Sequence, residues 1–180
     1  MKRIIQDLIL GDEMVFKNLV KENQARVYHH VMQILRNREE AEDVCQETFI
    51  QVFESINDFK GESSLSTWII RIAINKALMK LRKEKRRNQL LMLLPWWMPT
   101  EAKSLENKEF HPDILLENQE KAATLYKAID SLSPNQRVAF TLIKIDERSY
   151  AEASELMNMS IKAIESLVSR AKDNVKKQLK

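Results

Sequence analysis

The sequence predicts an all-α protein made of two small helical domains joined by a linker. The 180 residues contain only two glycines and four prolines, and Leu, Lys, Glu, Ala, Met and Gln are frequent. Apolar residues recur at steps of three and four over long stretches, whereas no Val/Ile/Thr-rich run alternates as a strand would. A chain of this length fits one or two domains, so the loss of helical periodicity near its middle argues for two.

Charge is segregated along the chain although the net charge is only +3. Acids gather between Glu39 and Glu54, while Arg71 to Arg87 holds eight Lys or Arg residues against one acid. Such local fields indicate one surface for a basic partner and another for a polyanion. The lone Cys45 excludes an internal disulfide, and no signal peptide or membrane-length apolar run is present, so we expect a cytoplasmic protein.

The chain begins with a brief expected helix that stops at Gly11, and Asp12 is the expected N-cap of a long helix ending near Asn37. His29 and His30 fall inside that helix. Lining the helix flank is the simpler interpretation, because metal binding needs convergent ligands and the remaining histidine is distant in sequence.

The next expected helix, residues 41–56, has the most regular apolar stripe in the chain. Its predicted core positions are Ala41, Val44, Cys45, Thr48, Phe49, Val52, Phe53 and Ile56. Within that stripe, Cys45 is expected to act as a small buried apolar side chain and not as a nucleophile. The opposite face, called here the acidic face, carries Glu40, Asp43, Gln46, Glu47 and Glu54. By itself this face fits either a solvated surface or a docking surface.

A loop over residues 59–64 separates this helix from a basic one. Gly61 breaks the pattern, and Ser63 or Ser64 is the expected N-cap of a helix whose buried side includes Leu65, Trp68, Ile69, Ile72 and Ala73. From Lys76 onward the helix is increasingly cationic, which suits contact with phosphates. The loop combines an aromatic residue, a glycine and hydroxyls, and such a loop suits the capture of an unstacked base.

After Arg87 the helical pattern weakens, so we predict an N-terminal domain over residues 1–88, a linker over 89–113 and a second domain over 114–180. The linker contains an apolar stretch, Leu90–Met98, that is unusual for a free tether. Packing on the protein's own domains and binding to a partner both remain open for it.

The second domain carries strong helix-start signals. Ser133-Pro134-Asn135-Gln136 and Ser149–Glu152 are capping boxes, and Asn158 and Ser160 predict a tight turn before a last helix. A short helix, a turn and a longer helix make a helix-turn-helix, which reads DNA in many proteins and is purely structural in others. The last helix should bury Ile161, Ile164, Val168, Ala171 and Val175.

Two long segments resemble one known family. AEDVCQETFIQVFESI with FKGESSLSTWIIRIAINKALMKLRK resembles region 2 of the extracytoplasmic-function (ECF) sigma factors, small bacterial members of the sigma-70 family. LSPNQRVAFTLIKIDERSYAEASELMNMSIKAIESLVSRAK resembles their region 4. The two blocks occur in the family's order with a linker between them. The sequence departs from the family at Ile74 and Met79, where arginine and aspartate are frequent, and at Lys162, Glu165 and Leu167 in the last helix.

The resemblance implies partners and residue roles. The acidic helix would dock on the β′ clamp helices of core RNA polymerase through Asp43, Gln46, Glu47 and Phe49. The β flap would be a second polymerase contact, and an anti-sigma factor would be the inhibitor. The minus-ten promoter element would be recognised and melted by Phe59, Lys60, Gly61, Ser63, Ser64, Trp68, Arg71, Asn75, Lys80, Arg82 and Lys83. The minus-thirty-five element would be read by Lys162, Glu165, Ser166, Ser169 and Arg170.

Other interpretations stay open at this point. Trp68 lies on the apolar stripe and fits the core as well, and Asn75 fits a bracing role. For the whole chain, the alternative to a sigma factor is an autonomous helix-turn-helix regulator that uses only its C-terminal domain. An enzyme is not expected, because the sequence has no glycine-rich phosphate loop, no clustered metal ligands and no nucleophile with its base, and neither a cofactor nor a metal is predicted.

Overall fold

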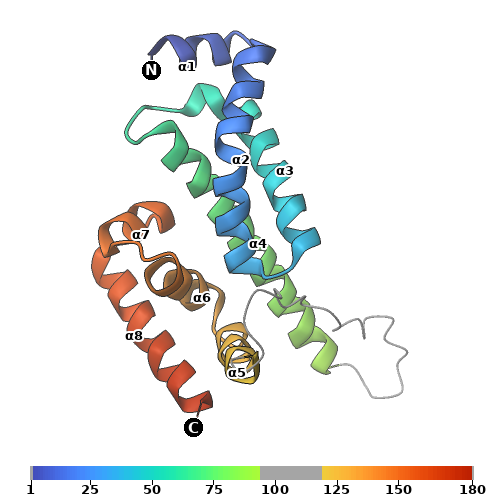
Figure 1. Cartoon of the computed structure of the whole chain (residues 1–180), viewed down its shortest axis with the longest axis vertical. Coiled ribbons are helices and arrows are strands. Elements are labelled where there is room, and N and C mark those ends of the chain that lie inside the picture. Colours follow the sequence, from blue (N-terminus) through green and yellow to red (C-terminus); the bar gives the residue numbers. More distant parts are fainter. Residues whose placement is uncertain (1, 94–118, 180) are drawn as a thin grey trace.

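The computed structural model describes residues 2–93 and 119–179, and within these ranges it contains helices and no β-strand. The all-α prediction is therefore confirmed (Figure 1). The N-terminal bundle consists of α1 (Lys2–Ile9), α2 (Glu13–Leu35), α3 (Arg38–Ser55), the short 3₁₀ turn η1 (Ile56–Asp58) and α4 (Leu65–Leu93). The C-terminal domain consists of α5 (Gln119–Asp130), α6 (Pro134–Phe140), the π-helical segment η3 (Thr141–Ile145), α7 (Tyr150–Met157) and α8 (Ile161–Gln178).

Capping side chains set the helix starts in the N-terminal bundle. Gly11 has a φ of +80°, and Asp12 Oδ1 accepts hydrogen bonds from the backbone N–H groups of Met14 and Val15 at 2.9 and 3.1 Å. Ser64 Oγ accepts from the N–H of Thr67 at 3.0 Å at the start of α4. These helix starts agree with the sequence prediction.

The helix-turn-helix also forms as predicted. Ser133 and Ser149 open α6 and α7 with capping boxes, in which the Ser149 N–H donates to Glu152 Oε2 at 2.9 Å. Asn158 ends α7 in the left-handed conformation with a φ of 50°, and Ser160 Oγ accepts from the N–H of Ala163 to begin α8.

Helix α4 is longer than the sequence pattern suggested. It continues past Arg87 to Leu93, because Asn88–Leu93 is dominated by Leu, Met and Gln and the first proline comes only at Pro95. The expectation that helical periodicity is lost after Arg87 is therefore wrong for residues 88–93. Most of the apolar stretch Leu90–Met98 and the start of the second domain near Ile114 lie outside the described residues.

Two residues predicted as core are exposed. Phe53 of α3 has 53% of its surface accessible and Ile161 of α8 has 46%. Each sits at the edge of its stripe, where a helical periodicity of 3.6 residues turns the side chain away from the neighbouring helices. The other predicted core residues of α3 and α8 are buried or, for Cys45, half-buried.

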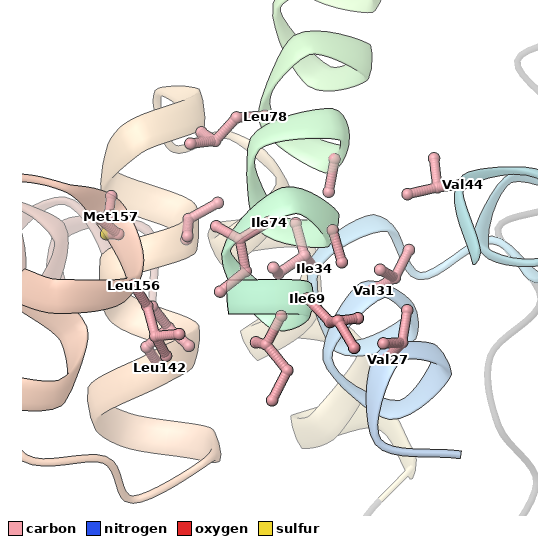
Figure 2. Close-up of a cluster of buried hydrophobic side chains, with 14 of the residues drawn as sticks. Val27, Val31, Ile34, Val44, Ile69, Ile74, Leu78, Leu142, Leu156 and Met157 are labelled. Carbon is pink, nitrogen blue, oxygen red and sulfur yellow. The ribbon is translucent and has the colours of Figure 1, made fainter. Parts of the chain in front are cut away.

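The two halves of the chain share one hydrophobic core, which the sequence did not predict. Helix α4 packs against α2 and α3 on one side and against α6 and α7 on the other (Figure 2). Ile74 and Leu78 point from α4 toward the C-terminal domain, where Leu142, Leu156 and Met157 lie. Because Ile74 has no exposed surface and Leu78 only 5%, the interface between the halves excludes water as the core of the bundle does.

Candidate functional site

The acidic face of α3 is accessible to a partner. Asp43, Gln46 and Glu47 are exposed, as the sequence predicted for this face. Two of its carboxylates also reach back to α4, with Asp43 Oδ2 lying 3.4 Å from Lys80 Nζ and Glu47 Oε2 lying 3.6 Å from Lys76 Nζ. Such exposed pairs are weak, so a partner can displace them at little cost.

An apolar groove runs between α2 and α3 beside the acidic face. It encloses about 670 Å³, and its lining includes Phe49, which is only 8% exposed and so offers little of its ring to a ligand. Phe16 and Phe53 meet edge to face across it, with ring centroids 5.2 Å apart. The full lining is Phe16, Val20, Gln24, Cys45, Gln46, Phe49, Ile50, Phe53 and Glu54.

Sequence reasoning missed most of this groove because Phe53 was assigned to the core, Phe16 was interpreted only as part of the apolar periodicity of the long second helix, and Ile50 was not named. Phe53 and the neighbouring Ile50 are both exposed, and an exposed apolar patch of this kind is typical of a binding surface. Cys45 lines the groove, and burial raises the pKa of its thiol, which keeps the sulfur protonated and a poor nucleophile. This agrees with its predicted role as a small apolar side chain.

The loop over residues 59–64 presents an aromatic pair at its base. The rings of Phe59 and Trp68 lie 5.3 Å apart at an interplanar angle of 55°, and both are half-buried. Gly61 has a φ of +73°, a conformation that favours glycine, and Lys60, Gly61 and Ser64 are exposed. Ser64 is also committed to its capping role. The loop therefore combines accessible backbone with a rigid aromatic base.

The basic residues of α4 do not all face solvent. Asn75, Arg82 and Lys83 are exposed, and so the bracing role considered for Asn75 has no support among the described contacts. Arg71 Nη2 lies 3.4 Å from Glu155 Oε1 of α7, and Arg82 Nη2 donates to Asn135 Oδ1 of α6 at 3.0 Å. Two predicted minus-ten contacts thus touch the C-terminal domain.

Helix α8 presents a polar face to solvent. Lys162, Glu165, Ser169 and Arg170 are exposed, and the half-buried Ser166 accepts a hydrogen bond from Arg170 Nη2 at 2.8 Å. The predicted reading residues therefore share one face. The arrangement matches that of a helix able to enter a groove of DNA.

The two histidines of α2 contact the C-terminal domain, a role that the sequence did not reveal. Nδ1 of the buried His30 donates to Asp146 Oδ2 at 2.6 Å, which leaves its Nε2 as an acceptor for Arg148 Nη2 at 3.4 Å. His29 Nε2 lies 3.8 Å from Asp146 Oδ1. No group of three or more potential ligands able to hold a metal occurs among the described residues.

A second ion cluster joins the end of α2 to α5 and α6. Asp130 lies between two guanidinium groups, 3.0 Å from Arg36 Nη1 and 2.9 Å from Arg137 Nη1. Burial lowers the pKa of both arginines from their ordinary value, which reflects the cost of removing each cation from water. Asp130 offsets that cost for the pair.

No helix in the described part of the chain is long and apolar enough to cross a membrane.

Comparison with known proteins gives two family matches. Residues 19–87 match the model of sigma-70 region 2, and residues 122–175 match that of sigma-70 region 4. These ranges cover the acidic helix, the loop and most of α4 in the first case and the helix-turn-helix in the second.

Relatives align over nearly the whole chain. The chain is 26% identical to the RNA polymerase sigma-H factor of Pseudomonas aeruginosa, covering 99% of this chain and 93% of that protein. It is 26% identical to the ECF RNA polymerase sigma factor SigW of Bacillus subtilis, covering 99% and 96%, and 28% identical to the ECF RNA polymerase sigma-E factor of Escherichia coli K12, covering 96% and 90%.

Solved structures share the fold. The sigma factor RpoE in complex with the anti-sigma factor NepR from Bartonella quintana is 24% identical with a TM-score of 0.59, covering 91% of this chain and 96% of that one. CnrH in complex with the cytosolic domain of CnrY is 19% identical with a TM-score of 0.61, covering 98% and 94%.

Proposed function

Because this chain belongs to the sigma-70 family as an ECF sigma factor, which directs RNA polymerase to promoters, we propose how its surfaces divide that work. The acidic face and the groove beside it bind core polymerase, the loop and α4 open the minus-ten element, and α8 reads the minus-thirty-five element. The protein acts in the cytoplasm, where it supplies binding energy and catalyses no reaction of its own.

Polymerase docking is supported by the chemistry of α3. The apolar groove lies beside exposed Asp43, Gln46 and Glu47, so an amphipathic basic helix would bury its apolar residues in the groove and place its cations against the carboxylates. This fits the β′ clamp helices as the occupant. Phe49 contributes from the lining of the groove.

Promoter melting is supported by the loop next to the Phe59–Trp68 pair. Exposed Lys60, Gly61 and the hydroxyls of Ser63 and Ser64 offer donors, while the aromatic pair offers a rigid wall for an extruded base. Capturing that base offsets the few kcal/mol, roughly, that unstacking costs. Arg71, Asn75, Lys80, Arg82 and Lys83 would then follow the phosphates along α4.

Reading of the minus-thirty-five element is assigned to the exposed face of α8. Lys162 and Arg170 suit phosphate or guanine contacts, whereas Glu165 suits a cytosine amino group. Ser166 and Ser169 complete the face. The acceptor at Glu165 predicts a cytosine preference at one position of the element.

Control by an anti-sigma factor is also proposed, since one solved structure with this fold is a sigma factor in complex with an anti-sigma factor, and another is a complex with a partner's cytosolic domain. The apolar stretch Leu90–Met98 is the candidate contact. Replacing Trp96 and Trp97 with serine should weaken capture of the chain by its inhibitor, and unchanged affinity would remove the linker from the interface.

The test is reconstituted transcription with purified core enzyme on genomic fragments, followed by sequencing of the transcripts. We expect promoter-specific initiation that requires this protein. Glu47→Lys should reduce retention of the protein by immobilised core enzyme at least tenfold, whereas the control Glu22→Lys, an exposed residue of α2 outside the groove, should not. No initiation on any fragment, together with tight binding of the free protein to a palindromic operator, would favour the autonomous regulator instead.

A further inference from the structure

We propose that a polar cleft between the two halves of the chain binds a ribonucleotide. The cleft lies between α2, the first turns of α4 and the turn that joins η3 to α7, and its volume is about 580 Å³. Small-molecule sites in proteins typically enclose roughly 300–1,000 Å³. The cleft shares no residue with the apolar groove between α2 and α3, and only Ser64 of its lining is also assigned to promoter DNA. It is therefore a surface that the sigma function leaves without a ligand.

Two arginines, one from each half, line the cleft. Arg26 of α2 is exposed and has no ion pair or hydrogen bond within the described part of the chain. Arg148 is held by two neighbours, because its Nη1 donates to Glu152 Oε1 at 3.0 Å and its Nη2 lies 3.4 Å from His30 Nε2. A guanidinium has more N–H donors than these two contacts use. Two guanidinium groups at one cleft suit a phosphate, which accepts paired hydrogen bonds from each.

The start of α4 supplies further donors for a phosphate. Ser64 Oγ accepts from the Thr67 N–H at 3.0 Å, and no helical carbonyl reaches the N–H groups of Leu65 and Ser66. The hydroxyls of Ser66 and Thr67 belong to residues of the lining. The amino end of a helix carries a partial positive charge, which favours an anion. This helix start reinforces the site that the two arginines define.

A buried carboxylate distinguishes the cleft from a simple anion site. The side chain of Asp146 is 3% exposed, and its Oδ2 accepts from His30 Nδ1 at 2.6 Å, whereas its Oδ1 has no hydrogen-bond partner. Buried polar atoms without partners are rare, because each one loses its hydrogen bonds to water. A ligand hydroxyl can donate to Oδ1, as ribose hydroxyls do to a carboxylate in dinucleotide sites of another fold. The cleft therefore favours a phosphate that carries sugar hydroxyls.

His29 offers a surface for the base of the nucleotide. Its side chain is 60% exposed and its Nε2 lies 3.8 Å from Asp146 Oδ1, so rotation of the ring gives a ligand hydroxyl access to that oxygen. Imidazole rings stack on nucleobases. Ala25 lies one turn before His29 on the same face of α2 and is exposed too. This wall of the cleft thus suits a flat ring, with the sugar toward Asp146 and the phosphate toward the arginines.

The first experiment titrates adenosine 5′-monophosphate into the full chain by isothermal calorimetry at constant ionic strength. We expect saturable binding of one nucleotide per chain. The Tm should rise with nucleotide concentration, because residues of both halves form the site only in the folded chain. Absence of saturable binding up to about 10 mM nucleotide would overturn the proposal.

Analogues test the sugar and the phosphate separately. The 2′,3′-dideoxy form of the same nucleotide has no sugar hydroxyl for Asp146, and inorganic phosphate has neither sugar nor base. Each should bind at least about tenfold more weakly than adenosine 5′-monophosphate, since each leaves polar groups of the cleft unpaired. Equal affinity for either analogue would overturn the assignment to a ribonucleotide.

Arg26 is the best position at which to test the location of the site. Arg26→Gln removes an exposed cation that has no partner in the described part of the chain, so the fold should be unaffected and nucleotide affinity should fall about tenfold. The matched control, Lys21→Gln, removes a cation from an exposed position of α2 outside the cleft and should leave the affinity unchanged.

A second control separates the cleft from the surface assigned to promoter DNA. Lys83→Ala removes an exposed cation of α4 outside the cleft, so binding of adenosine 5′-monophosphate should be unchanged. Binding that survives Arg26→Gln but is lost in Lys83→Ala would place the nucleotide on the DNA-binding part of α4 and would overturn the proposal.

Discussion

The guanidinium of Arg137 in α6 donates a hydrogen bond from Nη2 to the backbone carbonyl oxygen of Leu35, the last residue of α2, at 3.2 Å. The last carbonyls of a helix lack partners within it, and a cation placed there also complements the helix dipole. Arg137 is only 2% exposed. The C-terminal domain thus supplies the cap of a helix in the N-terminal bundle. Without it, the Leu35 carbonyl would lose this hydrogen bond.

Removal of Asp130 should be among the most destabilising single changes at the interface between the halves. Asp130→Ala leaves Arg36 and Arg137 desolvated and without their shared anion, and we expect a loss of about 3–5 kcal/mol in the free energy of unfolding. Arg36→Ala should lower the free energy of unfolding by less, because Asp130 still pairs with Arg137. Urea unfolding measures both, with Asp173→Ala as an exposed control expected to stay within about 0.5 kcal/mol of wild type.

Ile74 and Met79 offer a matched pair of changes on α4. Ile74→Ala removes a fully buried side chain and should cost about 2–5 kcal/mol, whereas Met79→Ala, at a residue 65% exposed, should change stability by less than about 0.5 kcal/mol. Thermal unfolding of the full chain measures the difference. Equal effects would contradict the buried position of Ile74 in solution.

The capping box of α7 should give the stability of the protein a defined acid dependence. Hydrogen bonds from the Ser149 N–H, the Ser149 hydroxyl and Arg148 lower the pKa of Glu152 from 4.5 to about 2. Since the folded pKa lies below the unfolded one, this stabilisation is complete above about pH 5 and disappears as the pH falls toward 2.

The measurement is Tm as a function of pH for wild type and Glu152→Gln. The difference in Tm is expected to be constant above pH 5 and to shrink toward zero near pH 2, because Gln keeps an acceptor but not the charge. Glu165→Gln is the control, as its exposed carboxylate makes no hydrogen bond in the described part of the chain. A Tm difference that persists at pH 2 would contradict a stabilising role for the ionised Glu152 carboxylate in the capping box.

Two DNA contacts should behave differently under the proposed function. Lys83→Ala should weaken promoter binding by the polymerase complex for every sequence and lower the salt dependence by about one counterion. Glu165→Ala should instead relax the preference for cytosine at one position of the minus-thirty-five element by about 1–3 kcal/mol. Binding of a promoter library at two salt concentrations separates these outcomes, and a sequence-independent effect of Glu165→Ala would contradict base reading.

Local signals in the sequence were sufficient to predict where several helices begin. Asp12, Ser64, Ser149 and Ser160 each cap the helix that was predicted to follow them, because a cap depends on hydrogen bonds over only two or three residues. The polar faces of α3 and α8 were also predicted correctly, because helical periodicity determines which residues lie on each face. The resemblance to ECF sigma factors, carried by long motifs in the right order, is confirmed by the matches to regions 2 and 4.

Long-range relations could not be predicted from the sequence. Nothing in the local pattern around His30 indicates a partner at Asp146, 116 positions away, and an apolar residue at Ile74 looks the same whether it faces its own bundle or another domain. The groove was missed for a related reason. Phe53 matches the helical stripe of α3, but only tertiary packing decides whether a residue at the edge of a stripe is covered.

The π-helical segment Thr141–Ile145 determines how the residues that follow it are rotated about the helix axis. Its closing bonds run from the Asp146 N–H to the Thr141 carbonyl and from the Arg148 N–H to the Leu142 carbonyl, five and six residues apart instead of four. Each residue of an α-helix turns by about 100°, so deletion of one residue here would rotate Asp146 by roughly that angle away from His30. The contact between Asp146 and His30 therefore depends on the number of residues in this segment. It does not depend in the same way on which residues they are. Among sequences that keep the His30–Asp146 contact, insertions and deletions should be absent between Thr141 and Asp146 even where the residues themselves vary.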